Sequence, residues 1–190
     1  MRTFALLLAL PGLALTAQTA CAQDKAAAQQ IAEAVSALPA DMRAGARVLG
    51  YSGAAVVTLR DGSNGMICLA DEPGDDRLHV ACYHESLEPF MARGRELRAA
   101  GKSREEVQQM RLAEIEAGTL PLPERWAALY TLTGGTFDAD AGAIVGGRGN
   151  SVIYVPYATA ATLGISEQPA RDRPWLMAPG TPWAHVMIGG

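Results

Sequence analysis

Residues 54–69 read AAVVTLRDGSNGMICL, and this stretch decides the fold that we expect. Its first part, Ala54 to Arg60, is rich in the β-branched and apolar residues typical of a strand. Asp61-Gly62 and Asn64-Gly65 are dipeptides that favour tight turns between strands. We therefore expect Met66 to Leu69 to return as the hairpin partner of the first strand, in a mainly antiparallel sheet.

Further strands and helices are predicted on both sides of this stretch. Apolar spacing and turn signals predict helices over 26–38, 87–100 and 104–117, and strands over 47–49, 78–83, 127–133, 151–157 and 185–188. Ser103 and Glu106 have the spacing of a capping box. Residues 134–150 include six glycines and predict a long mobile loop. This order favours one α+β domain over 23–190, with a mainly antiparallel sheet and two to three helices.

Composition excludes two classes of protein. The chain has 190 residues, with 16 Lys and Arg against 20 Asp and Glu, so no basic excess points to nucleic acid. No apolar run reaches the roughly 18 residues of a membrane-spanning helix. We therefore expect neither a nucleic-acid partner nor a transmembrane segment in the mature chain.

The first 22 residues have the pattern of a secretory signal peptide. Arg2 gives a positive start, residues 4–15 are almost wholly apolar, and Ala20-Cys21-Ala22 fits the rule for the cleavage site. We predict cleavage after Ala22 and a periplasmic or secreted protein. A lipid anchor on Cys21 is the minor alternative.

Cleavage would leave two cysteines, Cys68 and Cys82, in a chain exported to an oxidising compartment. A disulfide between them is then the natural state. It would close a polar loop that cannot bury itself. A reactive cysteine with His84 as its base is the functional alternative.

The same loop offers candidate metal ligands. Asp71, Glu72, Asp75 and Asp76 carry the hard oxygen atoms that Ca²⁺ prefers, and His79 lies close by in the sequence. A charged loop with Pro and Gly is also typical of a simple solvated surface, so we assign no metal to it.

His84-Glu85 and His185 are the candidates for acid–base chemistry. Histidine is a natural general base near neutral pH, and a neighbouring carboxylate can orient it. The alternative is a capping or surface role where a strand meets a helix. No nucleophile, metal or cofactor motif accompanies these residues, so we assign no catalytic residue and expect no cofactor.

The segment Gly62-Ser63-Asn64-Gly65-Met66-Ile67-Cys68 resembles the marker of a group of uncharacterised exported bacterial proteins. That marker is Gly-Thr/Ser-Asn-Gly-aromatic-x-Cys after a strand, with a second Cys soon after, and Met66 stands here at the aromatic position. The ending His185-Val186-Met187-Ile188 is similar to theirs as well. The resemblance implies export and a paired Cys68–Cys82, and it carries no catalytic residue.

Together these features favour an exported, non-catalytic domain that binds a small ligand, a glycan or a protein partner. The alternative is a secreted hydrolase that uses His84 or His185 as its general base. Convergence of both histidines and a carboxylate in one hollow would favour the hydrolase.

Overall fold

The computed structural model describes residues 25–188, and the predicted signal peptide, its cleavage site and Cys21 lie outside these residues. Ten strands are present in the described part: β1 Arg47–Ser52, β2 Ala55–Arg60, β3 Met66–Leu69, β4 His79–His84, β5 Ala127–Thr133, β6 Thr136–Asp138, β7 Ala143–Val145, β8 Arg148–Tyr154, β9 Trp175–Met177 and β10 His185–Ile188. The helices are α1 Ala27–Val35, α2 Ala40–Arg43, α3 Glu88–Ala99, α4 Arg104–Glu116 and α5 Ala160–Leu163, with a 3₁₀ turn, η1, at Glu85–Leu87.

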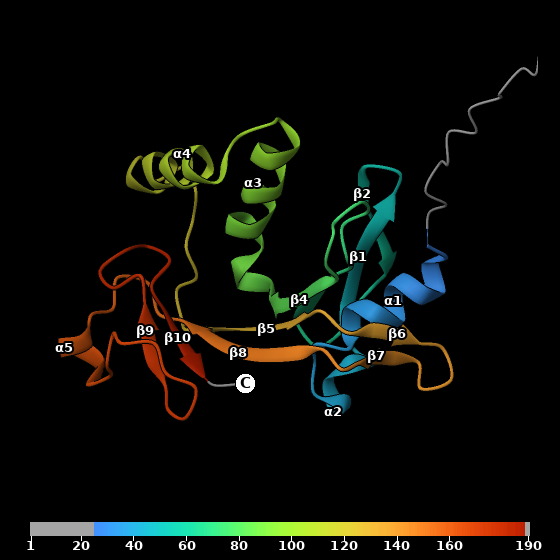
Figure 1. The fold of residues 1–190 in the computed structure, drawn as a ribbon. Coiled ribbons are helices and arrows are strands. Elements are labelled where there is room, and N and C mark those ends of the chain that lie inside the picture. Colours follow the sequence, from blue (N-terminus) through green and yellow to red (C-terminus); the bar gives the residue numbers. More distant parts are fainter. Residues whose placement is uncertain (1–24, 189–190) are drawn as a thin grey trace, which may run out of the picture.

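Eight of the strands form one curved sheet in the order β2-β1-β3-β4-β5-β8-β10-β9 (Figure 1). The β1–β3 pair is parallel and the other neighbours are antiparallel. The expected α+β domain with a mainly antiparallel sheet is thereby confirmed. Three helices have nine or more residues, and α2 and α5 are single turns of four residues.

The expected hairpin between residues 54–60 and 66–69 is wrong. β2 instead pairs with β1 through a tight turn after Ser52, and β3 lies on the other side of β1, parallel to it. The connection crosses the start of β1 at close range, since a β-carbon at Gly62 would lie 2.3 Å from the backbone nitrogen of Arg47. Ser63 N donates to Gly45 O over 2.7 Å. Gly62 therefore allows two backbone segments to cross at close range.

The expected loop over 134–150 is also partly wrong. β6 and β7 form a small antiparallel hairpin within it, and β8 begins at Arg148. Gly135 has a φ of +78°, and a β-carbon there would lie 2.4 Å from Val145 O. Ile144 N donates to Ser36 Oγ over 3.2 Å, which ties the hairpin to the end of α1.

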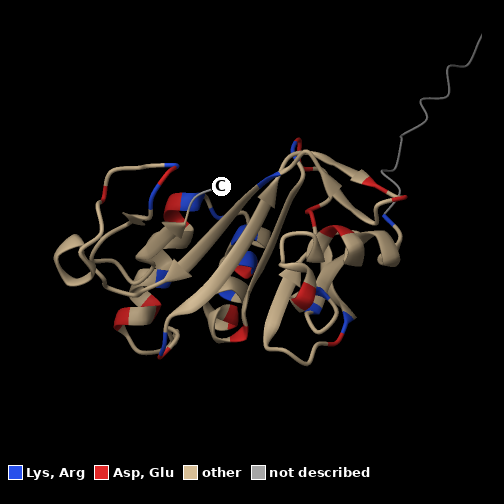
Figure 2. Ribbon diagram, turned by 90° about the horizontal axis from the view of Figure 1, so that it is seen from below, with Lys and Arg blue, Asp and Glu red and all other residues tan. Residues whose placement is uncertain are grey.

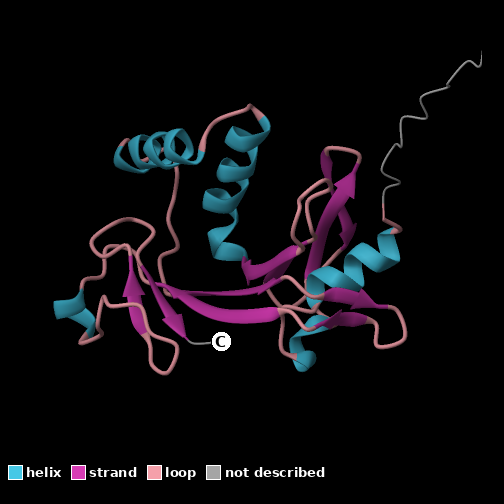
Figure 3. Cartoon of the chain, in the orientation of Figure 1, coloured by secondary structure: helices cyan, strands magenta, loops and turns pink. Residues whose placement is uncertain are grey.

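The two faces of the sheet are covered by different helices (Figure 3). Side chains alternate along a strand, so Cys82 of β4 points to one face and Tyr83 to the other. α1 covers the part of the first face that β1, β3 and β4 form. The core beneath α1 includes Val48, Cys68 and Cys82. The predicted disulfide between Cys68 and Cys82 is present there, joining directly paired residues of β3 and β4.

α3 and α4 cover the second face. β4 leads through η1 into α3, and Leu87, Leu129 and Val152 belong to the core beneath it. The expected capping box is confirmed, because Ser103 Oγ accepts from Glu106 N and the Glu106 carboxylate accepts from Ser103 N. Within residues 25–188, no helix combines the length and the apolar character needed to cross a membrane.

Candidate functional site

Two hollows lie between the α3–α4 pair and the sheet. The central hollow has a volume of about 270 Å³ and lies against strands β1, β3, β4 and β5. The C-terminal hollow has a volume of about 380 Å³ and lies against the ends of β8 and β10. Arg98, Arg111 and Tyr154 line both hollows, so the two adjoin across these side chains. We call them together the α3–α4 cleft.

Arg111 enters the cleft from the buried side of α4. It follows the buried Val107 by four residues, so both lie on one face of the helix. A β-carbon at Gly94 of α3 would lie 2.9 Å from Arg111 Nη1, so the missing side chain makes room for the guanidinium. The guanidinium lies 3.8 Å from the centre of the Phe90 ring, and Nη1 donates to Phe90 O over 3.0 Å.

The charge of Arg111 has no counter-ion among residues 25–188. No ion pair includes it, and its buried Nε has no hydrogen-bond acceptor within that part of the chain. Burial lowers the pKa of Arg111, and the nearby Arg98 lowers it further. Arg98 is exposed and also forms no ion pair with the described residues. Arg98 and Arg111 therefore bring two positive charges to the cleft that form no ion pair within residues 25–188.

Arg95 on α3 is held differently. Its Nη2 donates to Glu88 Oε1 over 2.7 Å, and its Nη1 donates to the Tyr83 hydroxyl over 2.8 Å. That hydroxyl donates in turn to Glu88 Oε2 over 2.6 Å, and burial raises the pKa of Tyr83. The three side chains form a closed set that fixes α3 to β4. Arg95 is therefore paired with a carboxylate, whereas Arg98 and Arg111 have no carboxylate partner among residues 25–188.

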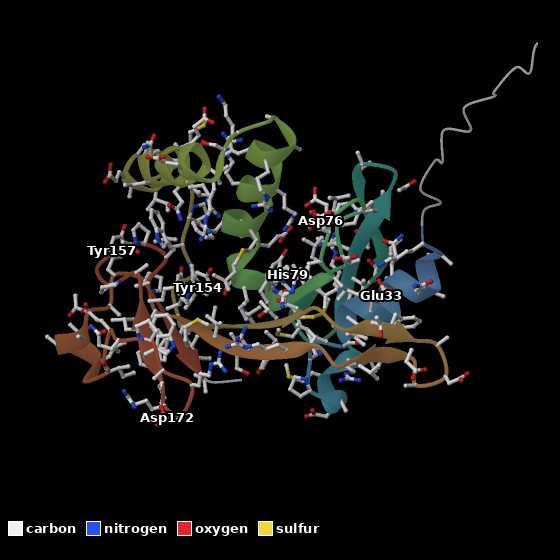
Figure 4. All side chains as sticks on the ribbon, in the orientation of Figure 1. Glu33, Asp76, His79, Tyr154, Tyr157 and Asp172 are labelled. Atoms are coloured by element: carbon white, nitrogen blue, oxygen red, sulfur yellow. A yellow bond between two sulfur atoms is a disulfide. The ribbon has the colours of Figure 1, made fainter. Side chains whose placement is uncertain are left out.

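Tyr154 and His185 are paired residues of β8 and β10, with ring centres 5.2 Å apart and planes 24° apart. His185 Nδ1 lies 2.8 Å from Trp183 O. A carbonyl only accepts, so Nδ1 carries the proton and Nε2 carries a lone pair. Burial lowers the pKa of His185, which keeps the ring neutral near pH 7. In Figure 4, Tyr154 lies on the sheet below α3.

His84 lies on the opposite face of the sheet from His185. Tyr83 faces α3, so the next residue along β4, His84, faces away from α3. In addition, three strand spacings, about 14 Å in all, separate β4 from β10 in the sheet. His84 Nδ1 accepts from Ser86 N over 3.2 Å and caps η1. A neutral His84 therefore presents an N–H at Nε2. The two candidate histidines do not converge in one hollow.

Glu85 lies beyond the end of β4, in η1. It lines a separate hollow that also includes Arg47, Asp61 and Ser63. A β-carbon at Gly65 would lie 3.7 Å from Glu85 Oε1 and 3.4 Å from His84 Nε2, so the two side chains flank the same glycine.

The acidic loop forms no metal centre in the described residues, where no group of three or more His, Cys, Asp or Glu is placed to hold an ion. Asp71 instead accepts from His79 N over 2.8 Å and pairs with Lys25 Nζ at 3.1 Å. Glu72, Asp75 and His79 line the central hollow. Asp76, labelled in Figure 4, is not among the lining residues. The loop thus contributes two acidic side chains, Glu72 and Asp75, to the lining of the central hollow.

Arg98 and Arg111 are candidate site residues that the sequence did not indicate as such. The available signal was the position of Arg111, four residues after Val107 on the face of α4 that packs inward. An arginine at such a position is unusual, because a charged group is rarely buried without a partner. In the view of Figure 2, acidic and basic residues are interspersed along the ribbon. Arg111 differs from the other basic residues in its buried Nε, which has no acceptor among residues 25–188.

Comparison with known protein families, with curated proteins and with solved structures finds no match to this chain. The resemblance at residues 62–68 therefore stays a prediction.

Proposed function

We propose that this protein is an exported, non-catalytic domain that binds a small organic anion in the α3–α4 cleft. One observation carries the proposal: the guanidinium of Arg111 is part-buried beside Arg98, and neither has a carboxylate partner among residues 25–188.

The energetics of charge burial support this proposal. A buried charge without a partner is unfavourable, and breaking a buried pair is strongly destabilising. A bound carboxylate or phosphate would supply the missing acceptor, and the planar guanidinium suits both groups. The volumes of 270 and 380 Å³ lie near the lower end of known ligand sites, so they favour a compact molecule over a polymer or a protein.

The predicted export indicates the compartment in which the ligand would be found. The signal-peptide pattern and the disulfide both fit an oxidising compartment outside the cytoplasm. The ligand would then be a solute of the periplasm or of the surrounding medium.

Calorimetric titration of the full chain, produced by export into a bacterial periplasm, tests the proposal. The probes are inorganic phosphate, sulfate, citrate and gluconate. We expect at least one to bind, and Arg111→Met to weaken that binding at least tenfold, because a hydrogen bond to a charged group is worth about 1.5–3 kcal/mol. Arg173→Met is the matched control, since Arg173 is exposed and its ion pair within the described part of the chain is with its neighbour Asp172. Failure of all four probes, or equal binding by Arg111→Met, would contradict the proposal.

The second candidate function is a secreted hydrolase. The observation that favours it is the free Nε2 lone pair of His185, which is the form that a general base needs. His84 has the other tautomer and is the weaker choice. Hydrolysis of a phosphate or carboxylate ester, abolished in His185→Gln while the product anion still binds, would establish this function. Absence of turnover by the wild type would rule it out for those esters.

A further inference from the structure

The polar groups of the C-terminal hollow include both hydrogen-bond donors and a hydrogen-bond acceptor. Arg98, Arg104 and Arg111 offer only donors, which match the oxygens of an anion. His185 offers an acceptor, because Trp183 O holds the proton on Nδ1. No described residue donates to His185 Nε2.

A simple anion leaves this acceptor unmatched. The oxygens of sulfate or of a carboxylate are acceptors only, and they would face a lone pair without a proton between them. A polar group that loses water without gaining a partner is costly to binding. A ligand that brings a donor as well as a negative charge would match both kinds of group in the hollow.

We infer that the ligand of the C-terminal hollow is a hydroxylated organic anion, a sugar acid or a sugar phosphate, whose hydroxyl donates to His185 Nε2 while its acidic group binds Arg111. This inference rests on the proposed function and narrows it to one class of ligand.

Two further features of the hollow support a polyhydroxylated ligand. Tyr154 stacks on His185, and its hydroxyl has no hydrogen-bond partner among residues 25–188. Burial raises the pKa of Tyr154, so the hydroxyl keeps its proton and is able to donate or accept. Trp183 is half-buried and also lines the hollow, and its aromatic ring suits the C–H face of a sugar-like chain.

Matched pairs of probes test the inference. The carboxylate pair is gluconate and hexanoate, and the phosphate pair is glycerol 3-phosphate and propyl phosphate. In each pair the second member lacks the hydroxyl groups and keeps the acidic group. We expect the hydroxylated member of at least one pair to bind the wild type at least tenfold more tightly. The pair that shows the preference identifies the acidic group.

Three variants assign the preference to His185. His185→Phe keeps an aromatic ring beside Tyr154 and removes the acceptor, so we expect the preference to fall to less than threefold. His185→Gln keeps an acceptor oxygen and should recover part of the preference. His84→Asn, on the other face of the sheet, should leave it unchanged, because asparagine also caps helices.

The outcomes separate this inference from the function on which it rests. Arg111-dependent binding without preference within either pair would overturn the hydroxylated class and leave anion binding intact. A preference that persists in both His185→Phe and His185→Gln would overturn the role of His185. Binding of none of the anions would overturn both proposals.

Discussion

The two faces of the sheet differ in how completely their buried polar groups are partnered. On the α1 face, Gln30 Nε2 donates to Tyr51 O over 3.0 Å, and Tyr51 N donates to Gln30 Oε1 over 2.8 Å. Glu33 is only 1% exposed, yet it accepts from Lys25 over 2.8 Å and from Gln29 over 2.9 Å. On the α3–α4 face, Arg111 and His185 keep a donor and an acceptor without partners in residues 25–188.

This difference separates the groups that hold the fold from the groups available to a ligand. A buried polar group with its partners stabilises the native state, and one without them destabilises it. Substitutions on the α1 face should therefore lower stability, whereas substitutions in the α3–α4 cleft should lower binding.

The largest effect is expected from the disulfide on the α1 face. Replacing both Cys68 and Cys82 with Ala removes a cross-link over a sequence separation of 14 residues, and the loss should be about 3 kcal/mol of unfolding free energy. Urea denaturation of the variant and of the wild type measures it. The reduced wild type is the control and should match the variant within about 1 kcal/mol. A loss below 1 kcal/mol would mean that the loop is held by its other contacts.

The next effect is expected at Gln30, which is 5% exposed. Gln30→Ala leaves the N–H and the C=O of Tyr51 without their partners, and an unmatched buried group costs about 1–3 kcal/mol. Gln109→Ala on the exposed side of α4 makes the same change of residue type with little burial, so it should cost less than about 0.5 kcal/mol. Equal losses of unfolding free energy in the two variants would show that the hydrogen bonds between Gln30 of α1 and Tyr51 of β1 do not stabilise the fold.

The sequence predicted elements with local signals well. β5 and β10 have the expected bounds, the Ser103–Glu106 capping box is present, and Cys68 pairs with Cys82. The strands and the capping box depend on residue spacing along the chain. The disulfide depends on a choice among very few cysteines. The strand partner of β3 was mispredicted because the turn dipeptides mark a reversal and do not name the strand that receives it.

The candidate site was predicted only in part for a related reason. His185 was a candidate from its residue type, but its tautomer depends on the local backbone conformation that places Trp183 O beside Nδ1. The role of Arg111 depends on which carboxylates are near it in space, and the sequence contains twenty acidic residues that could have paired with it. Charge compensation is a property of tertiary contacts, so spacing alone does not reveal it.

A smaller effect should appear as opposite pH sensitivity of the two faces. Burial lowers the pKa of Lys25, but its hydrogen bonds to Glu33 and Asp71 raise it more, to above its ordinary value. Its contribution to stability is present below that ordinary value and is lost as the pH rises through the raised pKa. Burial lowers the pKa of His185, so stability is lost as the pH falls below 6.5 and the unfolded chain takes up the proton.

Urea denaturation across the pH range checks this contrast. Lys25→Met should flatten the alkaline loss only, and His185→Phe should flatten the acidic loss only. Each difference should stay below about 1 kcal/mol, because Lys25 is partly solvated and His185 is a single neutral ring. If both variants changed the stability loss at alkaline pH, or both changed the loss at acidic pH, the assignment of the alkaline loss to Lys25 and of the acidic loss to His185 would be contradicted.

The smallest effect on stability, and the sharpest test of the comparison, is expected at Arg111. Arg111→Met keeps an unbranched stem over the Phe90 ring and removes a part-buried charge that has no counter-ion among residues 25–188, which relieves the cost of burying that charge. Without ligand, the unfolding free energy should stay within about 1 kcal/mol of the wild type, in contrast to the loss in Gln30→Ala. With an anion at one hundred times its dissociation constant for the wild type, the wild type should gain about 2.7 kcal/mol, and the variant, which binds at least tenfold more weakly, should gain at most about 1.4 kcal/mol. A loss of more than 1 kcal/mol without ligand would instead make Arg111 part of the structure, because its bond to Phe90 O would then be holding α4 against α3.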